Sequence, residues 1–192
     1  MKLYPNELFH IYNRGNNSQQ IFFNRENYIY FLEKVNAFLK PHADIMAWCL
    51  MPNHFHFMVY ISPDKDVKEL SKGIQVILRS YTRGINKEQG RTGSLFTKNT
   101  CSKALSDKFR DTKTPYAETC FHYIHQNPMK AGLVKLMEDW EFSSFRDYVG
   151  LRNGKLINRN VTNQFLEISQ DVAQFYKNSY GDLDDGLISN IW

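Results

Sequence analysis

The chain has little cysteine and no long apolar run, and both features narrow its class. Its three cysteines, Cys49, Cys101 and Cys120, are odd in number and form no Cys-x-x-Cys pair. This disfavours a disulfide scaffold and suits a reducing compartment. No apolar stretch approaches the roughly 18 residues of a membrane span, and the first residues lack the pattern of a signal peptide. We therefore expect a soluble, cytoplasmic protein without a membrane partner.

A large excess of one charge is also missing. Lysine and arginine number 24 against 20 aspartates and glutamates, which gives a formal net charge of +4 and a pI near 8.9. Such mild basicity permits a nucleic-acid partner without requiring one. There is no internal repeat and no low-complexity segment. A length of 192 residues predicts one domain with a core of its own.

What is present is an alternation of strand-like and helix-like patterns. Strands are predicted over 8–12, 45–50, 54–61 and 95–101, and helices over 24–39, 67–85 and 116–126. The order predicts an α+β, ferredoxin-like antiparallel sheet with helices on one face and the other face open to a substrate. The third helix should end at Asn127-Pro128. Beyond it we expect short helices over 145–149 and 172–176 and a loose tail over 181–186, and before it a polar loop or short helix over 107–114.

The segment Met51-Pro52-Asn53-His54-Phe55-His56 carries the first candidate site. Residues two apart in a strand share a face, so His54 and His56 point the same way. Neutral imidazole is the commonest metal ligand, and two such rings could form most of a metal site. A lone His-x-His is a weak motif, and two ordinary histidines are about twice as common an explanation.

Tyr123 and Asn127, four residues apart on the third helix, add a nucleophile and a ligand. If their face meets the histidine strand, the Asn127 amide oxygen could be the third ligand, with Tyr123 beside the metal. A site of this kind keeps positions open for a phosphate oxygen. The chemistry would be attack by a tyrosine on a DNA phosphate, with a covalent phosphotyrosine intermediate. Taken alone, Tyr123 is more often a core residue, because the chain has eleven tyrosines.

The histidine segment, together with Tyr123-Ile124-His125-Gln126-Asn127-Pro128-Met129-Lys130-Ala131-Gly132-Leu133-Val134, resembles the single-tyrosine HUH transposases. It is most similar to the branch called REP-associated tyrosine transposases. Matching segments in the same order are Tyr12-Asn13-Arg14-Gly15, Ile21-Phe22-Phe23, Gly90-Arg91-Thr92-Gly93-Ser94-Leu95-Phe96 and Trp140-Glu141-Phe142-Ser143-Ser144-Phe145. The resemblance runs from about Tyr4 to Val149. It therefore implies a catalytic domain over 1–149 and leaves 150–192 as an extension of open role, expected to pack on the same domain.

The resemblance implies the HUH fold and the residue roles. His54 and His56 would be metal ligands, Asn127 would complete the site, and Tyr123 would be the nucleophile. The metal would be Mg²⁺ or Mn²⁺. The substrate would be single-stranded, hairpin-associated (REP-like) DNA, cut to leave a 5′-phosphotyrosine and a free 3′-hydroxyl. A homodimer is possible.

One alternative is an inactive or domesticated hairpin-binding protein of this fold. A replication nuclease of the same mechanism is less expected, because no helicase segment accompanies the motifs.

Basic side chains in the middle of the chain are candidate phosphate contacts. The candidates are Arg14, Arg79, Arg83, Arg91 and Lys98. Arg14 and Arg91 are favoured because they lie in glycine-containing turns, where a DNA backbone can approach closely. A solvated surface is the commoner explanation for any single one of them. His122 and His125 flank Tyr123 and are expected on the protein surface rather than at the metal.

Overall fold

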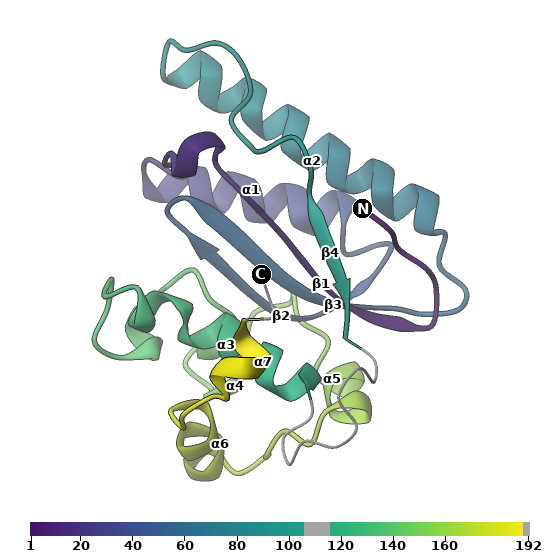
Figure 1. The fold of residues 1–192 in the computed structure, drawn as a ribbon, viewed down its shortest axis with the longest axis vertical. Coiled ribbons are helices and arrows are strands. Elements are labelled where there is room, and N and C mark those ends of the chain that lie inside the picture. Colours follow the sequence, from purple (N-terminus) through teal and green to yellow (C-terminus); the bar gives the residue numbers. More distant parts are fainter. Residues whose placement is uncertain (106–115, 190–192) are drawn as a thin grey trace.

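A four-stranded antiparallel sheet forms the centre of the computed structural model, which describes residues 1–105 and 116–189 (Figure 1). The strands are β1 (Glu7–Arg14), β2 (Asp44–Met51), β3 (His54–Ile61) and β4 (Cys101–Ala104), in the order β2-β3-β1-β4. Only Pro52 and Asn53 separate β2 from β3, so the pair forms a tight hairpin. The predicted α+β, ferredoxin-like class is confirmed, and β3 is an inner strand.

The last strand is shorter and later than predicted. β4 begins at Cys101 and pairs only with Phe9 to Tyr12 of β1, whereas the sequence predicts a strand over 95–101. Leu95 and Phe96 are buried between the sheet and its helices. Their apolar character therefore reflects burial as single residues in a loop rather than membership of a strand.

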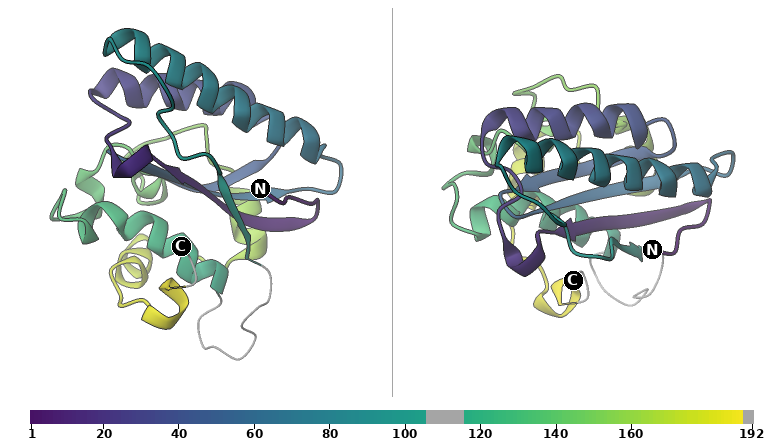
Figure 2. Two further views of the ribbon diagram at one scale, coloured as in Figure 1. Left: turned by 45° about the horizontal axis from the view of Figure 1, so that its top comes forward. Right: turned by 90° about the horizontal axis from the view of Figure 1, so that it is seen from above.

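Two helices cover one face of the sheet, as predicted. They are α1 (Arg25–Phe38) and α2 (Val67–Glu88), which lie side by side in Figure 2. The Asn24 side chain caps α1 by accepting a hydrogen bond from the Asn27 N–H at 2.9 Å. Strand residues that alternate toward this face pack against Phe31 of α1 and Tyr81 of α2 in one apolar core. That core holds the strands in place and so determines which of their side chains point to the opposite face of the sheet.

The opposite face is not open, which corrects the expectation of an exposed sheet surface. Helix α3 (Tyr116–Lys130) lies across β2 and β3 on that side. It also continues through Pro128, although the sequence predicts an end at Asn127-Pro128. Every residue from Phe121 to Pro128 is buried. The apolar burial of this helix therefore outweighs the local preference of a residue before proline for extended backbone.

Short helices complete this second layer. They are η2 (Met137–Asp139), α4 (Phe145–Tyr148), α5 (Arg159–Phe165), α6 (Val172–Ser179) and α7 (Asp185–Ile188), whereas η1 (Asn16–Ser18) lies apart from them, just after β1. The sequence predicts α4 and α6 but neither α5 nor α7. The expected loose tail over 181–186 is wrong at its end, because α7 begins at Asp185 and buries Leu187 in the core beneath α3. The segment 107–114 lies outside the described residues. Among the helices described, none has the length and apolar character needed to cross a membrane.

Candidate active site

The two histidines of β3 face α3, on the side of the sheet away from α1 and α2. The His56 side chain is fully buried and His54 is partly buried. Their ring centroids lie 4.9 Å apart with the planes nearly perpendicular. This is the shared face that the spacing of two in a strand predicts.

A third histidine, His10 of β1, fixes the orientation of His56. His10 Nε2 lies 2.8 Å from His56 Nδ1, and the two ring planes are within 15° of parallel. Both side chains are wholly buried. If His56 donates its Nδ1 proton to His10, the Nε2 atom of His56 keeps a lone pair for a ligand. Hydrogen bonds to one ring nitrogen commonly set the tautomer of a metal-binding histidine in this way.

Asn53 has the corresponding effect on His54. Its Oδ1 atom lies 2.6 Å from His54 Nδ1, and a carbonyl oxygen can only accept. The proton therefore resides on Nδ1, and Nε2 of His54 carries the lone pair. Both imidazoles are thus held from the Nδ1 side.

The helix supplies Asn127 and Tyr123 to the same place. The Asn127 side-chain amide donates from Nδ2 to the Tyr123 carbonyl at 2.8 Å, and the Asn127 side chain also hydrogen-bonds His54. The Tyr123 ring lies 5.8 Å from the His56 ring, edge to face, and is largely buried. The four side chains named from the sequence, on two segments nearly 70 residues apart, therefore meet at one point.

Burial keeps both strand histidines uncharged. Desolvation lowers the pKa of His54 to about 4, an effect that the hydrogen bond with Asn127 opposes and the positive charge of Arg14 assists. The pKa of His56 lies well below its ordinary value, first because of burial and then because of His10 and His54. Neutral imidazole is the form that binds a metal.

The donor set fits a divalent cation of mixed nitrogen and oxygen preference. The two imidazoles and the Asn127 side chain lie together, while within residues 1–105 and 116–189 no cluster of three or more His, Cys, Asp and Glu side chains could hold a metal. A site made of two histidines and one asparagine amide falls outside such clusters, because asparagine is not among those four residue types. An all-carboxylate cage of the kind typical of calcium does not form among these residues.

The basic residues named from the sequence do not gather at one place. Arg14 lies directly opposite His54 in the pairing of β1 with β3, exposed at the rim of the site. Arg79 and Lys98 line a separate cavity beside α2. Arg83 is exposed further along α2, and Arg91 lies in the turn after it, with its N–H bonded to the Asn86 carbonyl.

His122 and His125 are buried, which corrects the prediction that they lie on the surface. His122 Nδ1 is 3.1 Å from the Ser179 hydroxyl, and His125 Nε2 is 2.7 Å from that of Ser144. Both face away from His54, toward the segments that follow α3. Helical periodicity alone placed them off the Tyr123 face but could not show that C-terminal segments cover them.

Comparisons with known proteins show which sequences and structures this chain resembles. Residues 6–127 match the family model described as "Transposase IS200 like". A Haemophilus influenzae protein that carries the provisional name REP-associated tyrosine transposase is 27% identical over 107 residues. That match covers 53% of this chain and 58% of the relative, so the chain spans little more than half of the relative's length.

A solved structure shares the fold. It is described as a REP-associated tyrosine transposase bound to a REP hairpin, and it matches this chain with a TM-score of 0.59 at 22% identity. The match covers 78% of this chain and 86% of that one. The similarity therefore extends beyond the sheet to most of the described molecule.

Proposed function

We propose that this chain, which belongs to the family of IS200-like transposases, cleaves and rejoins single-stranded DNA with Tyr123 as nucleophile. The observation that carries the proposal is the meeting of Tyr123 and Asn127 of α3 with His54 and His56 of β3. Separately each motif is weak. Together they support the proposal, because phosphoryl transfer by a tyrosine requires a hydroxyl beside groups that could hold a metal.

His54, His56 and Asn127 would hold a divalent cation, Mg²⁺ or Mn²⁺. Once bound, such an ion would supply Lewis-acid polarisation of the scissile phosphate and would offset the charge that develops there. His10 and Asn53 orient the two imidazoles, so little reorganisation is needed when the site is filled. Arg14, opposite His54 on the neighbouring strand, is positioned to contact a phosphate of the bound strand.

Tyr123 performs the covalent step. Its phenolic oxygen, after loss of its proton, bonds to the phosphorus while the bond from phosphorus to the 3′-oxygen breaks. The 3′-oxygen takes up a proton and leaves as a free hydroxyl, and the 5′-phosphate stays on the tyrosine. Attack by a 3′-hydroxyl of another DNA end reverses these bond changes and joins the strands. Helix α3 holds the tyrosine rigidly, which favours this alignment.

The DNA partner we propose is single-stranded DNA flanking a hairpin. The match to a protein described as bound to a REP hairpin supports this choice, as does the exposed cation Arg14 at the rim of the site. The protein could act as a monomer or as a homodimer, since the site is built from one chain.

A nicking assay tests the proposal. A labelled hairpin with single-stranded flanks is incubated with the protein and Mn²⁺ or Mg²⁺. We expect cleavage that stops with a chelator and in His54→Ala. His42→Ala, which alters a half-exposed histidine in the loop before β2, should cleave normally. Cleavage that persists in chelator would contradict the metal site. Tight binding without any cleavage would instead support an inactive hairpin-binding protein.

A further inference from the structure

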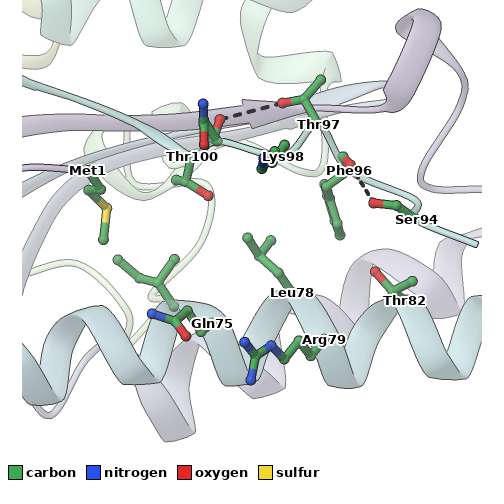
Figure 3. A pocket seen from close by; sticks show the side chains of 12 residues that line it. Met1, Gln75, Leu78, Arg79, Thr82, Ser94, Phe96, Thr97, Lys98 and Thr100 are labelled. Atoms are coloured by element: carbon green, nitrogen blue, oxygen red, sulfur yellow. Dashed lines mark hydrogen bonds between the residues drawn. The ribbon is translucent and has the colours of Figure 1, made fainter.

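A cavity of about 550 Å³ lies between α2 and the segment 94–100, away from the histidine site. Figure 3 shows that Leu78 extends from α2 and Phe96 from the facing segment into the same space. Together with Ile74 they make its apolar wall. Hydroxyl groups, among them those of Thr82 and Thr100, also line it. Pockets of this size with an apolar wall and a few polar groups are typical of sites for small organic groups.

The rim of the cavity is cationic. Arg79 projects from α2 and Lys98 belongs to the opposite segment, and both are exposed. No aspartate or glutamate lines the cavity. Within the described part of the chain neither cation forms an ion pair. The cavity therefore suits a ligand with one flat apolar part and one anionic part.

A short path of contacts joins this rim to the histidine site. The Thr97 N–H donates to the Arg14 carbonyl at 2.8 Å, and the Thr97 hydroxyl donates to Asn13. Arg14 in turn lies opposite His54. Neighbouring strands are about 4.8 Å apart, so Thr97, next to Lys98 of the rim, lies roughly 10 Å from the histidine strand.

We propose that this cavity holds an unpaired nucleotide of the DNA strand that passes through the Tyr123 site. The base would lie against Phe96 and Leu78, and its phosphates would contact Arg79 and Lys98. Single-strand sites commonly combine such a stacking wall with cations that follow the backbone. The inference rests on the proposed function, because it assumes that single-stranded DNA reaches Tyr123. It adds a separate point at which the flanking strand is recognised.

Binding measurements on two DNAs test it. Fluorescence anisotropy compares a hairpin that carries single-stranded flanks with a blunt hairpin of the same stem. The double variant Arg79→Ala with Lys98→Ala should bind the flanked hairpin about tenfold more weakly and the blunt hairpin almost normally. Loss of two single-strand phosphate contacts should also reduce the slope of log affinity against log salt by about 1.4.

A matched double variant controls for charge alone. Lys68→Ala with Lys87→Ala removes two exposed cations from the same helix outside the cavity. It should leave the difference between the two DNAs unchanged. Leu78→Trp keeps both rim cations and fills the cavity, so it should also weaken binding of the flanked hairpin. Normal binding of the blunt hairpin shows that this variant is folded.

Two results would overturn the cavity site and leave the proposed function intact. One is an equal loss in both double variants. The other is wild-type affinity of the Arg79 and Lys98 variant for the flanked hairpin while the wild type still nicks it. Absence of nicking in the wild type would instead contradict the proposed function.

Discussion

Among single residues, His10 orients His56, a role that the sequence motifs do not reveal. Its Nε2 atom lies 2.8 Å from Nδ1 of the buried His56 imidazole, and this contact fixes the orientation of the His56 ring. Replacing His10 by Phe removes the acceptor and keeps an aromatic volume. We expect Mn²⁺ affinity, measured by isothermal titration calorimetry without DNA, to fall about 10- to 100-fold, as for other hydrogen-bond partners of metal ligands.

The matched variant His10→Gln separates orientation from packing. Its amide oxygen can reach a position near that of Nε2 and can accept the same proton. We expect Mn²⁺ affinity within a few-fold of the wild type. If the phenylalanine variant binds Mn²⁺ as tightly as the wild type, His10 does not orient His56.

The sequence predicts the residues that converge, but not those that orient them. Alternation in a strand places His54 and His56 on one face, and helical spacing aligns Tyr123 with Asn127; both are local properties. The contact of His10 with His56 depends on the antiparallel register of β1 with β3, which pairs Tyr12 with His56. Register is decided by burial of whole strands, and no short segment contains it.

At the scale of elements, α3 shows where local rules fail. Pro128 lacks an N–H for the preceding turn, yet the helix runs on to Lys130. Its buried side packs on β2 and β3, and the Asn127 amide donates to the Tyr123 carbonyl within the same turn. Tertiary packing therefore sets the end of this helix. As a result, Asn127 is a helical residue, although the helix was expected to end there, and its side chain reaches the site.

His122, on the side of α3 that faces away from His54, makes the stability of the protein depend on pH. Burial lowers the pKa of His122 to about 4, while the unfolded chain has the ordinary value near 6.5. Between these values the unfolded state binds more protons, so stability is complete above about pH 6.5 and falls as the pH drops. By pH 5 this histidine should cost roughly 2 kcal/mol of unfolding free energy.

Urea denaturation of the wild type and of His122→Asn at pH 7.5 and pH 5.0 measures this cost. The asparagine can hydrogen-bond the Ser179 hydroxyl from near the position of Nδ1 but does not titrate. We expect a smaller loss of stability on acidification in the variant. An identical loss in both proteins would assign the pH dependence to other groups.

For the whole molecule, the order of strands and helices over residues 7–88 was predictable because their apolar periodicities are long and regular. The structure differs from the predicted elements where single apolar side chains are buried outside any periodic pattern. Phe96 belongs to a loop and not to the expected strand. Leu187 lies in α7, which packs against the core beneath α3. The Gln126 amide donates to the Ser179 and Gly181 carbonyls, so residues beyond 150 support the helix of Tyr123. Such contacts between distant segments leave no local pattern.

The central claim is that Tyr123 becomes covalently bound to a 5′-phosphate. Protein, Mn²⁺ and a hairpin labelled on the 3′ side of the cut are combined, denatured, and separated by gel electrophoresis. We predict a labelled protein band that is lost in Tyr123→Phe, which retains DNA binding, and that persists when Tyr116, a buried tyrosine two turns earlier in α3, is changed to Phe. A labelled band of normal intensity from Tyr123→Phe would contradict the account.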